Sequence, residues 1–301
     1  MRRLLTGRAQ RNFGFDKPFD VSVCQGIVFV SDTIKRQVHS FDFPAGQYRR
    51  IGVEGSGKLV KPMGLATDAQ CRVYVADRQL RQAVIFEKDG TFVNGLGGTE
   101  WFNQLSHLAV EPDGSRLYLV DTGGVESDDH HRVRVFDPAS GQHLYDFGQR
   151  GTAEGELNLP KDIEMGPGGL LHIVDSGNFR VQTFTTDGKF VRSFGSVGRQ
   201  FGQFARPKGL AVDPAGNIYI VDAAFGNFQI FDSQGQLLLS IGGREGVAGP
   251  GVANLPSGID VDEDGRIYFL DQFYRKVDIF RPIAMQADQG YLGQRLAPAS
   301  E

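Results

Sequence analysis

The chain has 301 residues, of which 40% are hydrophobic and 23% are charged, and 40 of them are glycine. Its net charge of −4 counts against a protein that is held to nucleic acid mainly by electrostatic attraction. No segment approaches the roughly 20 consecutive apolar residues of a membrane-spanning helix. The first residues contain no apolar signal-peptide core. We therefore expect either a cytoplasmic protein or one whose leader has been removed.

A short apolar run that ends in aspartate returns six times along the chain. These aspartates are Asp32, Asp77, Asp121, Asp175, Asp222 and Asp271. A phenylalanine follows nine residues later in five copies and fifteen residues later in the third. Such regular spacing indicates one supersecondary unit of about 45 residues that is repeated around a single body.

The predicted strands follow this repeat along the chain. Residues 2–7 (RRLLTG) resemble the fourth strands of later units, although no unit precedes them. The fifth unit is the clearest copy, with tight-turn residues between strands at 206–212, 218–222, 228–231 and 237–242. The sixth unit ends at its third strand. We therefore predict that residues 2–7 pair beside residues 277–280 and join the two ends of the chain.

Four antiparallel strands in each of six units predict an all-β, six-bladed β-propeller. Radial arrangement of the blades leaves no long exposed sheet edge. We assign residues 1–281 to one propeller domain and residues 282–301 to a surface tail, because the repeat ends at the third strand of the sixth unit.

Two units carry a family resemblance. The segments LPKDIEM with LHIVDSGNFRVQTF, and RPKGLAV with IYIVDAAFGNFQIF, resemble the NHL-repeat family. A single tryptophan, Trp101, and the lack of a repeated Trp-Asp pair argue against a WD-repeat propeller. The resemblance implies the propeller fold and suggests an extracytoplasmic location. It leaves function open, because the family includes RNA-binding, protein-binding and sensor modules and a metal-dependent amidating lyase.

Ionisable residues interrupt the small and apolar residues of the predicted inner strands. These residues are Asp20, His107, Asp162, Glu164 and Asp260. The insertion in the third unit adds Asp128, His130 and His131 on the same face. Mixed histidine and carboxylate ligands suit zinc, and oxygen ligands suit calcium. The alternative is a solvated loop, with His107 satisfied by a backbone carbonyl.

The six repeated aspartates have a structural interpretation, because a role that returns in every blade belongs to the blade. Each can accept hydrogen bonds from the backbone of the following loop. In five of the six units, the basic residue before the third strand suits pairing with that aspartate. These residues are Arg36, Arg81, Arg132, Arg180 and Lys276.

A second candidate surface lies in the loops of the fifth and sixth units. Phe225 and Asn227 stand in one loop, and Tyr274 and Arg275 stand in the next. Aromatic and arginine side chains on a rigid scaffold are common anchors for a partner. The alternative is that Phe225 and Phe273 pack between blades.

The sequence contains no nucleophile motif and no complete catalytic set. It therefore favours a non-catalytic recognition platform for a protein, peptide or small ligand. A metal-dependent lyase or hydrolase and an RNA-binding module are the alternatives. The two cysteines, Cys24 and Cys71, lie in the first turns of neighbouring units and are either bridged or free thiols.

Overall fold

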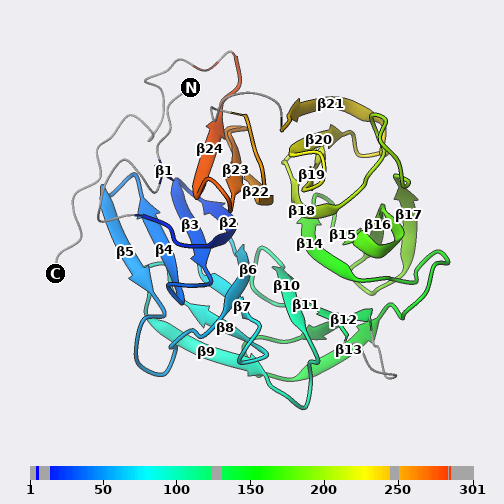
Figure 1. Cartoon of the computed structure of the whole chain (residues 1–301). Helices are drawn as coiled ribbons and strands as arrows, with labels where there is room; N and C mark the ends of the chain where they lie inside the picture. The colour runs from blue at the N-terminus through cyan, green and yellow to red at the C-terminus, as the bar shows by residue number, and fades with distance from the viewer. Residues whose placement is uncertain (1–4, 7–13, 124–130, 245–250, 284, 286–301) are drawn as a thin grey trace.

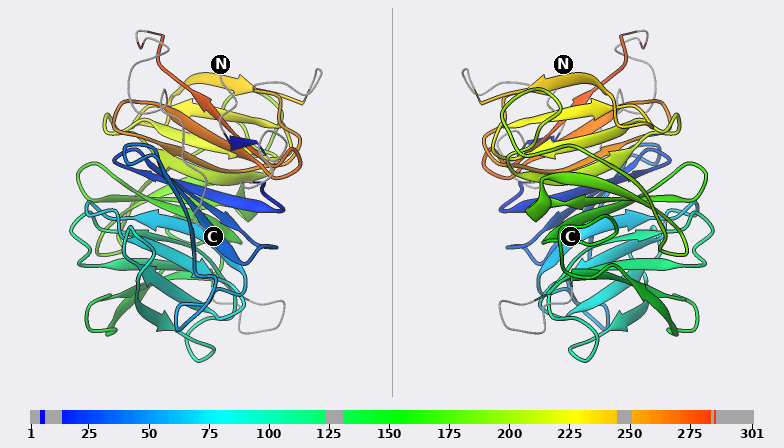
Figure 2. Two further views of the ribbon diagram at one scale, coloured as in Figure 1. Left: turned by 90° about the vertical axis from the view of Figure 1, so that its left-hand side faces the viewer. Right: turned by 90° about the vertical axis from the view of Figure 1, so that its right-hand side faces the viewer.

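The computed structural model describes residues 5–6, 14–123, 131–244, 251–283 and 285. Six four-stranded antiparallel sheets lie radially around a central axis, as Figure 1 shows. The side views in Figure 2 show these blades beside one another around the ring. The predicted all-β, six-bladed propeller is confirmed.

The first three blades take their strands in chain order from the axis outward. Blade 1 contains β2 (Pro18–Cys24), β3 (Ile27–Asp32), β4 (Gln37–Asp42) and β5 (Gln47–Ile51). Blade 2 contains β6 (Pro62–Thr67), β7 (Val73–Asp77), β8 (Gln82–Phe86) and β9 (Phe92–Gly97). Blade 3 contains β10 (Leu105–Val110), β11 (Leu117–Thr122), β12 (His131–Phe136) and β13 (His143–Phe147).

The next two blades repeat this order. Blade 4 contains β14 (Pro160–Gly166), β15 (Leu170–Asp175), β16 (Arg180–Thr185) and β17 (Phe190–Phe194), with the 3₁₀ turn η1 (Ser176–Asn178) after β15. Blade 5 contains β18 (Pro207–Val212), β19 (Ile218–Asp222), β20 (Asn227–Phe231) and β21 (Leu237–Gly242). The strands predicted for the fifth unit match these bounds within one residue.

Blade 6 combines both ends of the chain. It contains β22 (Pro256–Val261), β23 (Ile267–Asp271), β24 (Lys276–Phe280) and the two-residue strand β1 (Leu5–Thr6). Leu5 pairs with Val277 and Thr6 pairs with Lys276. The rest of segment 2–7 and most of the predicted tail 282–301 lie outside the described residues, so the pairing of the whole segment stays a prediction.

The apolar core is divided among the spaces between neighbouring blades. Buried clusters join blades 1 and 2, 2 and 3, 3 and 4, 4 and 5, and 5 and 6. Another cluster joins blade 6 to blade 1, where Leu270 and Val277 pack with Val28 and Val30. Packing therefore continues around the whole ring.

The inner strand of each blade has an irregular register near its start. In blade 5 the pairing shifts between Pro207 and Leu210, and the other blades shift at the equivalent position. A bulge of this kind redirects the side chain of an intervening residue. Asp20, His107 and Asp162 occupy this position. We call the side where the inner strands begin the entry face, and the side where they end the exit face.

Candidate functional site

The six repeated aspartates are buried and hold the loops of the entry face. Asp222, for example, accepts hydrogen bonds from the N–H groups of Ala205 and Arg206, at 2.8 and 3.0 Å, and of Ala224 and Phe225, at 2.8 and 3.2 Å. Backbone N–H groups donate to the other five in the same manner. These contacts support the structural interpretation, because each blade needs the same turn.

The predicted pairing of these aspartates with the preceding basic residues does not hold throughout. Arg180 Nε lies 2.8 Å from Asp175 Oδ2, as expected. Arg81 instead donates to the carbonyl of Phe102, and Arg132 pairs with Asp146. The general prediction was wrong for these two blades, where each arginine has a different partner.

Four predicted site residues line one polar cavity of about 180 Å³ in the central channel. They are Asp20 from blade 1, Asp162 and Glu164 from blade 4, and Asp260 from blade 6. The structure thus brings together side chains that are up to 240 residues apart in the sequence.

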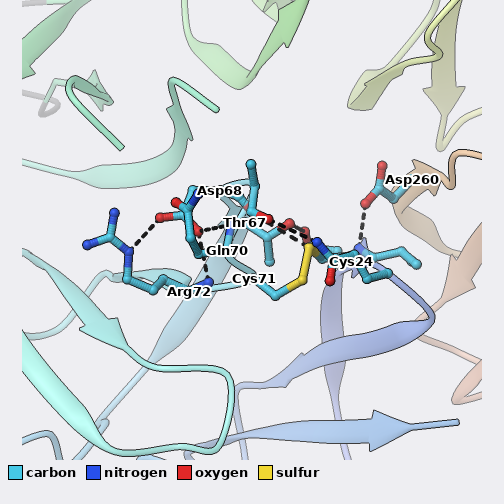
Figure 3. The surroundings of a disulfide bond; sticks show 11 residues. Cys24, Thr67, Asp68, Gln70, Cys71, Arg72 and Asp260 are labelled. Atoms are coloured by element: carbon cyan, nitrogen blue, oxygen red, sulfur yellow. Dashed lines mark hydrogen bonds and ion pairs between the residues drawn. A yellow bond between two sulfur atoms is a disulfide. The ribbon is translucent and has the colours of Figure 1, made fainter. Parts of the chain in front are cut away.

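Three of these carboxyl groups bond to the neighbouring blade. Asp20 Oδ2 accepts from the N–H of Leu65, and Asp162 Oδ2 accepts from the N–H of Leu210, both at 2.8 Å. Asp260 Oδ2 accepts from the N–H of Val23 at 2.6 Å, a contact visible in Figure 3. These carboxyl groups therefore satisfy backbone donors of the next inner strand and help to join the blades.

Burial raises the pKa of every carboxyl group in this cavity. The pKa of Asp20 and of Asp260 rises to about 7, with burial as the main cause in both. Burial and the neighbouring carboxylates also raise the pKa of Asp162 and of Glu164 well above the ordinary values. The cavity therefore holds protons at neutral pH that exposed carboxylates would have released.

His107 lies beside this acidic cluster. Its Nε2 atom is 3.9 Å from Asp20 Oδ2, and its ring is 5.6 Å from the ring of Phe19. Burial, followed by the charge of Lys161, lowers its pKa to about 3, so the imidazole is neutral at pH 7. The backbone of Lys161 lies close to the ring and acts in the opposite direction, to raise the pKa of His107. His107 Nδ1 is nevertheless buried without a hydrogen-bond partner among the described residues.

Packing explains the glycines that alternate with these polar residues. A Cβ atom on Gly64 would lie 2.7 Å from the His107 ring, and one on Gly258 would lie 2.4 Å from Asp20 Oδ1. Such distances are shorter than real contacts of a Cβ atom. Gly64 and Gly258 therefore leave room for the larger side chains around the axis.

The predicted metal site is only partly described. Asp128 and His130 lie outside the described residues. His131 begins β12, where its Nδ1 accepts from the N–H of Leu159 at 3.2 Å. Within the described ranges, no three His, Cys, Asp or Glu side chains are arranged to hold a metal ion. Backbone donors already occupy both oxygens of Asp162. These residues do not fit a preformed metal centre, and zinc or calcium binding stays a prediction.

A larger groove of about 810 Å³ lies between blades 5 and 6 at the entry face. Phe225 and Asn227, two of the predicted partner-binding residues, line it. Asn227 Oδ1 is buried and has no hydrogen-bond partner among the described residues. The lining also includes Arg199, Phe201, Ile241, Arg244 and Phe280.

The other two predicted partner-binding residues lie outside the lining of this groove. Tyr274 packs on Phe273 with ring centroids 5.1 Å apart, and Arg275 lies 3.9 Å from the Asp16 carboxylate. Phe273 is exposed, so the alternative that it packs between blades was wrong. Sequence reasoning missed Phe201, which is 79% exposed. The available signal was a phenylalanine set between Gln200 and Gly202 in a polar loop.

Two half-buried lysines at the mouth of the channel were also missed. Lys161 and Lys208 directly follow the prolines that begin β14 and β18. The signal was a repeated Pro-Lys pair in two adjacent units, where other units have Phe19, Met63, Ser106 or Ser257.

A disulfide bond joins Cys24 and Cys71 at the exit face, with the Cα atoms 5.6 Å apart (Figure 3). Cys24 ends β2, and Cys71 precedes β7. The bond therefore links blade 1 to blade 2, which decides between the two alternatives that the sequence left open. Disulfides are typical of oxidising compartments.

Comparison with known proteins supports the repeat assignment. Residues 204–231, which contain β18, β19 and β20, match the NHL repeat. This chain is a six-bladed β-propeller that contains an NHL repeat. The RING finger protein nhl-1 of Caenorhabditis elegans is 52% identical over 46 residues, which are 15% of this chain and 5% of that protein. The chain therefore spans only a small part of this relative. None of the helices in the described part is long and apolar enough to cross a membrane.

Solved structures with different activities share the fold of this propeller. Hydrazine synthase of Kuenenia stuttgartiensis is 14% identical with a TM-score of 0.63, over 90% of this chain and 97% of that chain. A streptogramin B lyase is 14% identical with a TM-score of 0.62, over 90% and 85%. The gluconolactonase XC5397 of Xanthomonas campestris is 22% identical with a TM-score of 0.62, over 89% and 86%. At these identities the likeness shows the fold alone.

Proposed function

We propose that this protein is a recognition platform whose groove between blades 5 and 6 binds an extended segment of a partner protein. The segment would carry apolar and acidic side chains. The observation that supports this proposal is the composition of the groove. Its described lining contains aromatic residues and two arginines, Arg199 and Arg244, and no carboxylate.

The apolar part of the groove provides anchoring surface. Phe201 is 79% exposed, and Phe225 is half-buried in the same groove. Exposed aromatic side chains beside a rigid cavity are favoured contact points, because their burial releases a large apolar area with little loss of side-chain freedom. A partner side chain that fills the groove would cover both rings.

The polar part of the groove provides direction and charge selectivity. Arg244 already donates to the carbonyl of Ala223 at 2.7 Å, which holds its guanidinium at the groove. Asn227 Nδ2 donates to Ser240 Oγ at 3.1 Å, which fixes the side-chain amide in the wall of the groove. Acidic side chains of the segment would complement the two arginines.

Selection of short peptides from a random library displayed on phage tests the proposal with the full chain as target. Enriched peptides are expected to combine aromatic or aliphatic residues with Asp or Glu. Phe201→Ser and Arg199→Glu should each weaken the binding of a synthetic selected peptide at least about tenfold, measured by fluorescence anisotropy. Lys189→Glu is the matched control, because Lys189 is exposed on the exit face. Absence of enrichment, or peptides that bind both groove variants normally, would reject the platform.

A metal-dependent lyase or hydrolase is the second candidate function. The observation that favours it is the neutral imidazole of His107, 3.9 Å from a carboxyl group whose pKa is about 7. A carboxyl group with such a pKa suits transfer of a proton near neutral pH. Lactone hydrolysis and lyase assays, with and without added zinc or calcium, test this candidate. Turnover that is lost in His107→Gln, with the fold preserved by circular dichroism, would support an enzyme over a platform.

A further inference from the structure

We propose that Lys161 and Lys208 form a site at the entry-face mouth of the channel for a small molecule that carries a carboxylate or phosphate group. This site is separate from the groove between blades 5 and 6, and its ligand is an anion and not a peptide segment. The inference goes beyond the proposed function and does not depend on it.

The two lysines occupy equivalent positions on neighbouring inner strands. They occupy the same position, directly after the entry proline, in the neighbouring blades 4 and 5. The inner strands β14 and β18 that carry them lie beside one another at the axis, as Figure 1 shows. The lysines therefore stand where an axial ligand would enter.

Further positive charge surrounds the pair. Lys161 experiences the charges of Arg78 and Arg206, and Lys208 experiences those of Arg206, Lys161 and Lys17. Both lysines are half-buried. Neither ammonium group has an ion pair or hydrogen bond with any of the residues that the structure describes, and the Asp271 carboxylate acts on Lys208 only from a distance. Half-buried like charges without a counter-ion are unfavourable, and a bound anion would relieve that repulsion.

The adjoining blade completes the surroundings of the site. Ser106, at the equivalent position in blade 3, donates its hydroxyl to the Lys161 carbonyl at 3.3 Å. His107 follows one residue further along the inner strand and interacts with the charges of both lysines. Its neutral ring provides a polar group without adding charge.

The acidic cavity deeper in the channel sets a limit on the ligand. Asp20 and Asp162 line that cavity beyond the lysines. An anion that entered the channel would be attracted at the mouth and repelled by any ionised carboxylate further in. The site therefore fits a compact anionic group that stays at the mouth, with the rest of the ligand on the entry face.

Isothermal titration of the full chain tests this site with three probes: sodium phosphate, sodium malate and sodium chloride at matched ionic strength. Saturable binding of phosphate or malate at one site per chain is expected, and chloride should give dilution heat only. Preference for phosphate would identify a phosphorylated ligand, and preference for malate would identify a carboxylate. Non-saturating heat with all three salts would overturn the proposal.

Two variants separate the site from general charge effects. Lys161→Met combined with Lys208→Met should lower the affinity at least about tenfold, because the anion loses both of its charge-assisted hydrogen bonds. Lys189→Met, on the exit face, should leave it unchanged. Bound phosphate or malate should also slow the acylation of Lys208 by an amine-reactive reagent, measured by peptide mass spectrometry. Unchanged affinity in the double variant, with a native circular dichroism spectrum, would refute the site. Phe201→Ser should have no effect, so failure of the groove and failure of this site are distinguishable.

Discussion

The two faces of the propeller differ in how completely their polar groups are bonded. At the exit face a buried aspartate accepts from a tyrosine hydroxyl in three blades, with distances of 3.1, 2.9 and 3.0 Å for the pairs Asp68–Tyr74, Asp213–Tyr219 and Asp262–Tyr268. The disulfide adds a covalent link on this side. At the entry face the described residues include the unpaired Asn227 Oδ1 and two lysines that lack a counter-ion.

This difference indicates that the candidate binding groups are concentrated on the entry face. A side chain whose polar atoms are already bonded forms few new hydrogen bonds with a ligand, whereas an exposed or unpaired side chain can form them. Substitution of the bonded exit-face groups should therefore lower stability, and substitution of the exposed groove residues and the channel lysines should change binding with little loss of stability.

Asp262→Ala should have the largest effect on stability. Its carboxylate lies 2.9 Å from Arg266 Nη1, and Arg266 is only 1% exposed. Removal of one partner leaves a buried charge poorly compensated, so we expect a loss of about 3–5 kcal/mol in the free energy of unfolding, measured in urea. Asp264→Ala is the matched control, because its half-exposed carboxylate contacts the same arginine. It should cost below about 1 kcal/mol, and an equal loss in both variants would contradict the comparison.

Removal of the disulfide should have the next largest effect. The bond closes a loop with a sequence separation of 47 residues, and it restricts the unfolded chain. Cys24→Ser combined with Cys71→Ser should lower the free energy of unfolding by about 2–4 kcal/mol. Wild-type protein treated with reductant should match the double variant. Alkylation of the untreated protein should label neither cysteine, and two labelled thiols would show that the bond does not form.

Lys208 should make stability depend on pH in the alkaline range. Burial and nearby cations lower its pKa to about 8, below the ordinary value of 10.5. Below pH 8 the lysine is charged in both states, and the folded state is destabilised by that charge. Between pH 8 and 10 the folded state releases the proton first, so stability rises with pH.

The measurement for this prediction is a comparison of urea unfolding at pH 7.5 and pH 10 in a buffer without phosphate or carboxylate. Wild-type protein should gain about 1–3 kcal/mol relative to Lys208→Met over that range. Lys189→Met provides the control for a general alkaline effect. Parallel pH profiles for wild type and Lys208→Met would show that the ammonium group is already neutralised by an unrecognised partner.

The fold was predictable because its signals are local and are repeated six times. Five of the six aspartates end a strand, and Asp121 is the residue before the last one of β11. The turn chemistry also repeats, so an ambiguous copy such as blade 3 can be interpreted from the others. The apolar clusters between blades, including Val28 with Leu270, then follow from the ring.

The candidate sites were predictable only in part. The convergence of Asp20 and Asp162 follows from their equivalent positions on the inner strands, and Asp260 lies two positions further along its strand. The bonds from Asp20 and Asp162 to the next blade were not predictable, because they depend on the local geometry of a bulge. Phe201 was missed because a loop has no period against which an exposed aromatic residue stands out.

The smallest expected change in stability is that of Phe201→Ser. Phe201 is 79% exposed, so loss of its ring should alter the free energy of unfolding by less than about 0.5 kcal/mol. Phe204→Ala, three residues away, provides the contrast, because Phe204 is fully buried and packs on Phe231 with ring centroids 5.7 Å apart. Removal of that ring should cost about 3–5 kcal/mol. If Phe201→Ser destabilised the protein as much as Phe204→Ala does, Phe201 would be required for folding and not mainly for binding. The proposed difference between the two faces would then be wrong.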